Sequence, residues 1–174
     1  LPTIECSDTT KAFGGWTSEA NGAGLQYTDA YGVSRFDYRE TSDKTFYPKW
    51  IDVFTFTTLS NGTYSVKVGE GLQYISTVTI PAIYNEVSVS TIEAGAFSNR
   101  KNVKIFNIPN TITNIELGIS GPYQSGSAFY GCTGITAINV YDAGATDPAY
   151  YSVNGALIYN NSVIGAKQLV AIPY

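Results

Sequence analysis

The chain has 174 residues and a net charge of −4, and only 14% of its residues are charged. That length is enough for one ordinary domain or two small ones. The 17 glycines, 14 tyrosines and 14% aromatic residues favour strands and turns over a helical bundle. The sequence has no histidine, which excludes a Ser-His-Asp triad and histidine-ligated zinc or haem. The few, scattered basic residues also argue against nucleic-acid binding.

Residues 1–70 are expected to form a small β-rich domain or cap, of which roughly the first 15 residues are mobile. Short strands are predicted over residues 24–27 and 34–38, between turns that contain glycine. The chain begins at Leu1 rather than at methionine, from which we expect that the sequence has been processed or trimmed and that any signal peptide has been removed with the missing part.

The strongest local signal before residue 70 is a pair of alternating runs, residues 53–59 and 63–68. They flank Asn61 and Gly62, a dipeptide that suits the tight turn between two antiparallel strands. This pattern predicts a β-hairpin closed by a primed turn.

Aromatic residues are concentrated in the first 60 positions, outside any repeat. Trp16 and Trp50 are the candidates for an exposed platform, because exposed tryptophan rings stack on sugars or anchor protein partners. The simpler interpretation is that these rings form the core of a small β domain that contains little leucine. An unassigned binding site is expected in this aromatic region.

The second part of the chain, residues 71–174, contains an internal repeat. An Ala-Phe pair occurs twice and is followed each time by apolar residues in an L-x-x-L-x-L spacing. We expect these positions to point inward and to stack on their counterparts in the next unit. The predicted core residues are Ala96, Phe97, Val103, Phe106, Ile108, Ala128, Phe129, Cys132, Ile135, Ile138 and Val140.

The residues between the inward positions of each repeat strand are expected to line a concave face. They are Ile105 and Asn107 in one unit and Ala137 and Asn139 in the next. These four residues are candidate ligand contacts, although the two stacked asparagines are better explained as a hydrogen-bonded ladder. A loop over residues 116–127 is expected to bulge from one unit, on a face that such proteins often use for binding.

Several segments in this half resemble the BspA-like leucine-rich-repeat surface proteins. They include the runs 79–86 and 108–115, and residues 127–132, Ser-Ala-Phe-Tyr-Gly-Cys, which match the family's Ala-Phe-x-Gly-Cys signature. Residues 151–159 and 169–173 resemble the family's terminal variant. The resemblance covers residues 75–174 and implies that Cys132 is a small buried core residue.

The resemblance and the repeat together predict the fold class. We expect a β-rich leucine-rich-repeat solenoid over residues 71–174, a right-handed superhelix of short strands and turns with little helix. An N-terminal β-rich cap, residues 1–70, would cover its first coil. Residues 98–100, Ser-Asn-Arg, depart from the family signature in the first unit.

The resemblance also implies a function: a non-enzymatic, secreted or surface-exposed bacterial module for cell adhesion or host-matrix binding. Its partner would be a protein or a glycan at the cell surface, with membrane contact only through a lipid anchor on a removed segment. The alternative is a carbohydrate-binding accessory protein that uses the N-terminal aromatics. No cofactor and no metal are expected.

A second alternative is a hydrolase with an unrecognised carboxylate pair, which needs two acids facing each other. Acids gather in two stretches, and solvated surface positions are their simplest explanation. The acids in question are Asp37, Glu40, Asp43, Asp142 and Asp147. The two cysteines, Cys6 and Cys132, make no metal motif, and a disulfide between them is left open.

Overall fold

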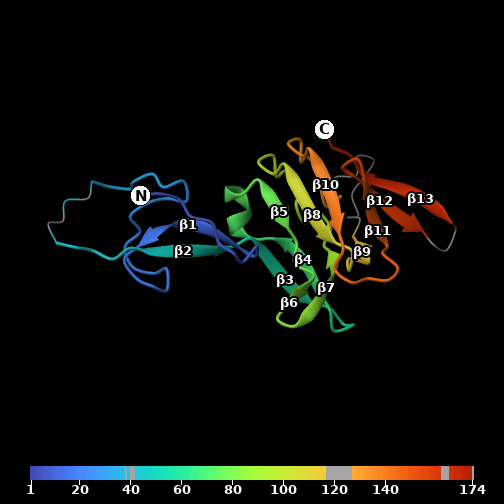
Figure 1. The fold of residues 1–174 in the computed structure, drawn as a ribbon, viewed down its shortest axis with the longest axis horizontal. Coiled ribbons are helices and arrows are strands. Elements are labelled where there is room, and N and C mark those ends of the chain that lie inside the picture. Colours follow the sequence, from blue (N-terminus) through green and yellow to red (C-terminus); the bar gives the residue numbers. More distant parts are fainter. Residues whose placement is uncertain (38, 40–41, 117–126, 162–164, 174) are drawn as a thin grey trace.

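The computed structural model describes residues 1–37, 39, 42–116, 127–161 and 165–173, which form short strands joined by turns (Figure 1). A short 3-10 helix, η1 (Glu70–Tyr74), interrupts them. The strands are β1 (Lys11–Thr17), β2 (Tyr47–Asp52), β3 (Phe54–Thr58), β4 (Tyr64–Val68), β5 (Thr77–Thr79), β6 (Ile83–Tyr84), β7 (Val87–Ile92), β8 (Ile105–Pro109), β9 (Asn114–Ile115), β10 (Ala137–Tyr141), β11 (Tyr150–Val153), β12 (Ala156–Asn161) and β13 (Ala166–Ala171).

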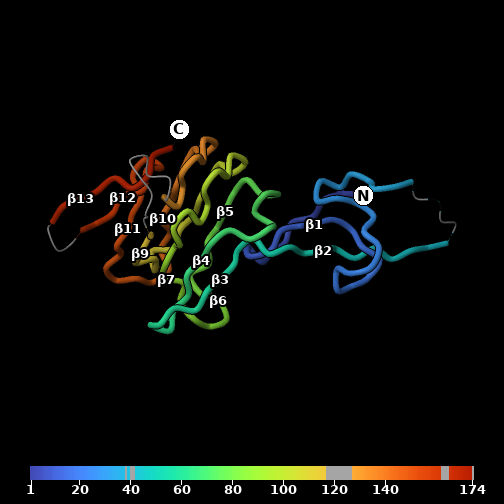
Figure 2. Tube along the Cα trace, turned by 180° about the vertical axis from the view of Figure 1, so that it is seen from behind, coloured from blue at the N-terminus to red at the C-terminus, as the bar shows by residue number. Residues whose placement is uncertain are grey.

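These strands are divided among four small sheets. The pair β1–β2 lies at one end of the long axis, and the antiparallel sheet β11–β12–β13 lies at the other (Figures 1 and 2). Between them lie the parallel sheet β10–β8–β5 and a mixed sheet in which β3, β4, β7 and β6 are neighbours and β9 also pairs with β7.

The expectation of a leucine-rich-repeat solenoid behind an N-terminal cap is therefore wrong. In such a solenoid every repeat adds a strand to one continuous parallel sheet. Here the parallel strands are split between two sheets, with β5, β8 and β10 in one and β4, β7 and β9 in another. The antiparallel pairs β3–β4, β6–β7 and β11–β12–β13 reverse the chain. The expectation of a β-rich protein with little helix agrees with the structure.

The internal repeat nevertheless places equivalent residues side by side. Strands β8 and β10 pair in the register that the repeat spacing predicts, with Phe106 opposite Ile138. At the two Ala-Phe turns, the Phe97 amide donates to the Ala128 carbonyl at 2.9 Å. The Phe97 and Phe129 rings stack with centroids 6.0 Å apart. The repeat therefore governs local stacking without generating a superhelix.

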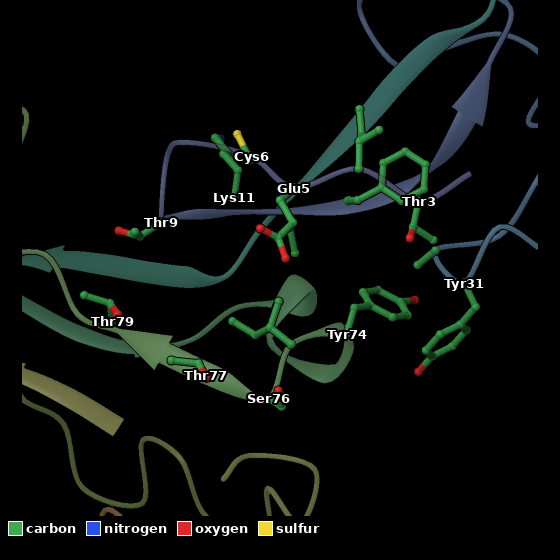
Figure 3. A pocket seen from close by; sticks show the side chains of 15 residues that line it. Thr3, Glu5, Cys6, Thr9, Lys11, Tyr31, Tyr74, Ser76, Thr77 and Thr79 are labelled. Atoms are coloured by element: carbon green, nitrogen blue, oxygen red, sulfur yellow. The ribbon is translucent and has the colours of Figure 1, made fainter. Parts of the chain in front are cut away.

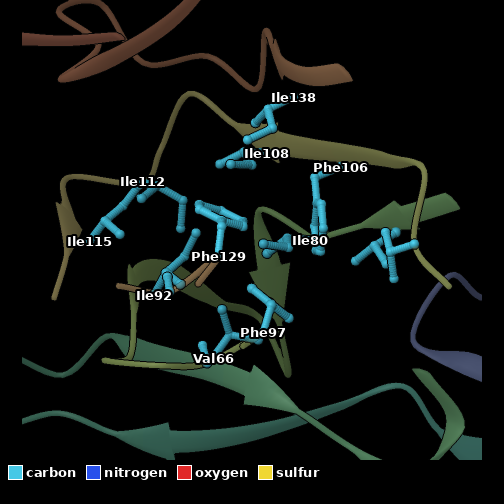
Figure 4. Close-up of a cluster of buried hydrophobic side chains, with 14 of the residues drawn as sticks. Val66, Ile80, Ile92, Phe97, Phe106, Ile108, Ile112, Ile115, Phe129 and Ile138 are labelled. Atoms are coloured by element: carbon cyan, nitrogen blue, oxygen red, sulfur yellow. The ribbon is translucent and has the colours of Figure 1, made fainter. Parts of the chain in front are cut away.

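The predicted core positions form the centre of one hydrophobic cluster (Figure 4). Ten of the eleven are buried, and Val140 is half-buried and packs against the same cluster. Cys132 is fully buried, as the resemblance implied, and its thiol lies 2.9 Å from the Phe97 carbonyl oxygen. The cluster also takes in Val53 and Val66 from the first 70 residues.

The predicted hairpin is confirmed, since β3 and β4 pair antiparallel with Thr57 opposite Ser65. The prediction of a primed turn is wrong. Gly62 has a positive φ of 82° but Asn61 does not, and the Leu59 amide bonds to the Thr63 carbonyl at 2.8 Å. Three residues thus form the loop, and a glycine in the left-handed region at its third position completes it.

The ranges 1–70 and 71–174 share a sheet, because β4 pairs in parallel with β7. The stretch through Gly15, which we expected to be mobile, includes the first part of β1, where Ala12 and Phe13 are buried. The predicted strands over 24–27 and 34–38 are represented by isolated bridges, one of them between Thr17 and Gln26.

Candidate functional site

The expected concave-face asparagines form a hydrogen-bonded ladder across three strands. Asn139 Nδ2 donates to Asn107 Oδ1 at 3.0 Å, and Asn107 Nδ2 donates to Thr79 Oγ1 at 3.0 Å. The ladder that the sequence analysis preferred is therefore confirmed. Ile105 and Ala137 lie opposite each other in the register and are half-buried. The Asn107 side chain uses its oxygen and a donor within the sheet, so it supports the strands rather than displaying a free amide.

The two tryptophans do not form an exposed platform. Both are half-buried, and both rings make edge contacts with Phe13, at centroid distances of 5.6 Å for Trp16 and 6.1 Å for Trp50. The Trp16 Nε1–H also donates to the Pro2 carbonyl at 2.7 Å. These contacts fit the interpretation of the N-terminal aromatics as packing residues.

A β-bulge brings Phe13 and Trp16 to the same face of β1. Phe13 pairs with Trp50 and Trp16 with Pro48, so β1 uses one residue more than β2 over this stretch. The extra residue lies at Gly14 and Gly15. Gly15 has a φ of 119°, and a Cβ there would lie 2.2 Å from the Thr28 carbonyl oxygen. Glycine at this position is therefore what allows the aromatic packing.

A cleft of about 480 Å³ lies between the N-terminal segment and β5. Figure 3 shows Thr9 and Lys11 on one side of it and Thr77 and Thr79 on the other. Its lining residues are Thr3, Ile4, Glu5, Cys6, Thr9, Lys11, Ala12, Phe13, Ala30, Tyr31, Tyr74, Ile75, Ser76, Thr77 and Thr79. We call this site the β5 cleft.

One end of the β5 cleft is aromatic. Tyr31 and Tyr74 meet there edge to face with ring centroids 5.8 Å apart, and Tyr31 remains 66% exposed (Figure 3). Elsewhere the walls are rich in hydroxyl groups, contributed by threonines and a serine. Such a lining can form hydrogen bonds with a polar ligand while the tyrosine rings cover an apolar part of it.

Lys11 is the cationic group of the cleft wall. Its Nζ lies 2.6 Å from Asp52 Oδ1, and this hydrogen bond raises the pKa of Lys11 above its usual value. The ammonium therefore stays charged at neutral pH and is held by a partner on β2. This arrangement is opposite to that of a catalytic lysine, whose pKa must be lowered before it can act as a base.

The cysteines are both free. Cys6 is half-buried in the wall of the β5 cleft, whereas Cys132 is in the hydrophobic core. Burial raises the pKa of the Cys132 thiol, which disfavours the reactive thiolate. The disulfide that the sequence left open is not formed.

The acidic residues give no support to the hydrolase alternative. Asp37, Asp43, Asp142 and Asp147 are exposed, and Glu40 lies outside the described residues. Within the described part of the chain, every carboxyl group with a clearly shifted pKa has it lowered, whereas a general acid needs a raised one. No group of three potential metal ligands occurs among those residues either.

The β5 cleft carried no motif that sequence reasoning could recognise. Its residues come from four separated stretches and are mostly threonines, tyrosines and small residues. The one relevant signal was the concentration of aromatics before residue 60, from which Phe13 and Tyr31 line the cleft. The expected binding loop over 116–127 falls largely on residues outside the described part.

No family model, curated protein or solved structure matches the chain. Among the described residues, no helix has the length and apolar character needed to cross a membrane.

Proposed function

We propose that this protein is a non-enzymatic binding module whose ligand is another protein, bound in the β5 cleft. The observation that carries the proposal is the composition of that cleft: hydroxyl-rich walls, a tyrosine pair of which Tyr31 is exposed, and a strand at the end of its sheet. Tyrosine is enriched where proteins bind proteins, because it combines a large apolar ring with a hydroxyl group.

The setting proposed for this activity is the outer surface of a bacterial cell or the surrounding medium. Support comes from the resemblance of residues 75–174 to BspA-like surface proteins and from the implied role in adhesion. The fold class that this resemblance implied was wrong, so the cleft rather than the family supports the binding proposal.

The experiment is a binding assay against immobilised fibronectin, collagen and laminin, read by biolayer interferometry. Tyr31→Ala removes an exposed ring from the cleft, and Tyr130→Ala removes a ring that is 43% exposed and does not line it. We expect Tyr31→Ala to weaken binding about tenfold and Tyr130→Ala to leave it unchanged. Equal effects of the two variants, or no binding to any of the proteins, would contradict the proposal.

A glycan ligand is the second candidate, and the tyrosine pair is the observation that favours it. Aromatic rings beside hydroxyl groups suit the apolar face and the hydroxyls of a sugar, although Trp16 and Trp50 are packed away. A glycan array probed with the same two variants distinguishes the candidates. Glycan binding that Tyr31→Ala abolishes, without protein binding, would support this candidate over the first.

A further inference from the structure

Strand β5 has one unpaired edge. It is the terminal strand of the sheet β10–β8–β5, and among the described strands only β8 pairs with it. The Ser76 carbonyl accepts from the Lys104 amide at 2.7 Å, and the Ile80 amide donates to the Asn107 carbonyl at 3.0 Å. Residues 76 and 80 therefore direct their backbone groups toward β8.

Thr77 and Thr79 direct their backbone groups the other way, because N–H and C=O alternate sides along a strand. Both residues line the β5 cleft. The cleft is thus bordered by two N–H donors and two C=O acceptors in the spacing that a neighbouring strand requires. Thr77 is exposed and Thr79 is half-buried, and the open backbone edge that they form is a template on which another strand can pair.

The size of the cleft suits one short strand. An extended residue takes about 3.3 Å along a strand, about 4.8 Å between strands and about 10 Å in depth, or about 160 Å³. The cleft, at about 480 Å³, is large enough to admit a short extended segment. Strand β5 is itself three residues long.

We propose that an extended segment of a partner protein binds in the β5 cleft as an added strand, hydrogen-bonded to Thr77 and Thr79. This inference rests on the proposed function and specifies its binding mode. The outward N–H groups donate to carbonyl oxygens of the segment, and the outward C=O groups accept from its amides. Alternate side chains of the segment face the cleft wall, where the Tyr31–Tyr74 pair selects an apolar one at one end.

The short length of β5 limits what can bind. Long unpaired edges promote aggregation, whereas a three-residue edge followed by Pro81 offers pairing over a brief stretch only. Affinity must then come from both the backbone bonds and the tyrosine contact. This combination favours one segment of defined sequence over indiscriminate strand pairing.

A proline scan of two strand edges tests the backbone contribution. Thr77→Pro removes an outward N–H without removing a bond to β8, and Thr77→Val removes the hydroxyl but keeps the N–H. The matched control is Thr58→Pro on the open edge of β3. On the other side of β4, the Glu93 amide donates to the Val66 carbonyl at 3.1 Å, so the backbone groups of Val66 face away from β3. Its partner Phe56 therefore directs its own backbone groups outward from the sheet, and Thr58, two residues along β3, does the same.

The probe is a displayed library of eight-residue random peptides, and the peptides that bind the unaltered protein are measured by fluorescence polarisation. We expect Thr77→Pro to weaken binding about tenfold or more, because it loses a donor and blocks close approach. Thr77→Val loses a cleft hydroxyl but keeps the N–H, so it should weaken binding clearly less than Thr77→Pro does. Thr58→Pro, which lies outside the cleft, should change the affinity by less than about twofold. Circular dichroism of each variant checks that it has folded. If Thr77→Pro misfolds, a protein with a backbone ester in place of the Thr77 amide is used instead, because the ester also lacks the N–H.

N-methylation of each successive residue of a binding peptide gives the second readout. Strand pairing predicts that affinity falls at every second residue, about fivefold each, because alternate amides face β5. A uniform or irregular profile, or equal binding to Thr77→Pro and Thr77→Val, would overturn strand addition. If Tyr31→Ala still weakened binding in that case, the proposed function would stand without this mode.

Two other results also decide the question. Absence of any peptide binding at millimolar concentration, with matrix-protein binding retained, would overturn strand addition while leaving the proposed function intact. Self-association in analytical ultracentrifugation that Thr77→Pro abolishes would show that the added strand comes from a second copy, contrary to the proposal.

Discussion

In the parallel sheet β10–β8–β5, the inward side chains Val78, Phe106 and Ile138 are fully buried and stack in register. In the β1–β2 sheet, every residue of β2 is at least partly exposed, and the aromatic rings pack edge to face. The first region is stabilised mainly by apolar burial, which follows a repeating pattern.

The β1–β2 region depends on polar contacts of a kind that do not repeat. Gln26 Nε2 donates to the carbonyl oxygens of Gly14 and Thr28, both at 2.8 Å, and the Trp16 amide donates to Thr28 Oγ1. These bonds hold the bulge in place. Two β regions of one chain are thus stabilised by different interactions, apolar burial in one and specific polar contacts in the other. The substitutions below test that difference.

The largest effect is expected in the hydrophobic core. Phe106→Ala removes a fully buried ring that contacts Phe97 and Phe129, and should lower the free energy of unfolding by about 3–5 kcal/mol. Phe36→Ala, in the N-terminal region, removes a ring that is 38% exposed and should cost about 1 kcal/mol or less. Urea denaturation measures both. Similar losses would show that the two regions are held alike.

The next effect concerns the bulge in β1. Gly15→Ala forces a side chain into a positive φ and against the Thr28 carbonyl, and should cost about 2–3 kcal/mol. Gly62→Ala is the matched control, since its φ is also positive but a Cβ there has nothing within 4 Å. It should cost about 1 kcal/mol. Thermal unfolding that ranked the two variants equally would contradict the steric role of the bulge.

A smaller effect is expected from the asparagine ladder. Asn107→Ala removes two side-chain hydrogen bonds and should cost about 1–2 kcal/mol, whereas Asn139→Ala removes one and should cost about 1 kcal/mol or less. Chemical denaturation of the single and double variants gives their coupling. Additive losses would indicate that the two asparagines do not act as one ladder.

The smallest effect concerns stability at acid pH. Burial alone would raise the pKa of Glu93, but hydrogen bonds from Ser65 and Thr57 and the charge of Lys67 outweigh it, so the pKa lies below its usual value. The stabilisation is complete above about pH 4.3, the usual glutamate value, and is lost as the pH falls through the lowered pKa. Glu93→Gln should therefore flatten this part of the stability profile, and an unchanged slope would contradict the assignment.

Sequence patterns identified much of the core and one hairpin. The repeat spacing located Phe97, Phe106 and Ile138, because inward residues recur at intervals that the backbone geometry sets. It did not reveal that the strands separate into four sheets. That outcome depends on which strand edges meet after the chain reverses, as when β4 pairs with β7 and Tyr64 lies opposite Val89.

The sequence by itself determined that the chain would be β-rich, where its central core would lie, and that the stacked asparagines would bond across strands. Only the tertiary structure decided the division into sheets, the packing of the tryptophans against Phe13 and the position of the β5 cleft. The reason is physical. Periodicity in the sequence indicates which side of a strand faces the core. A cleft forms where segments that are separate in the sequence come together, and residues as common as Thr77 and Tyr31 give no local pattern that predicts it.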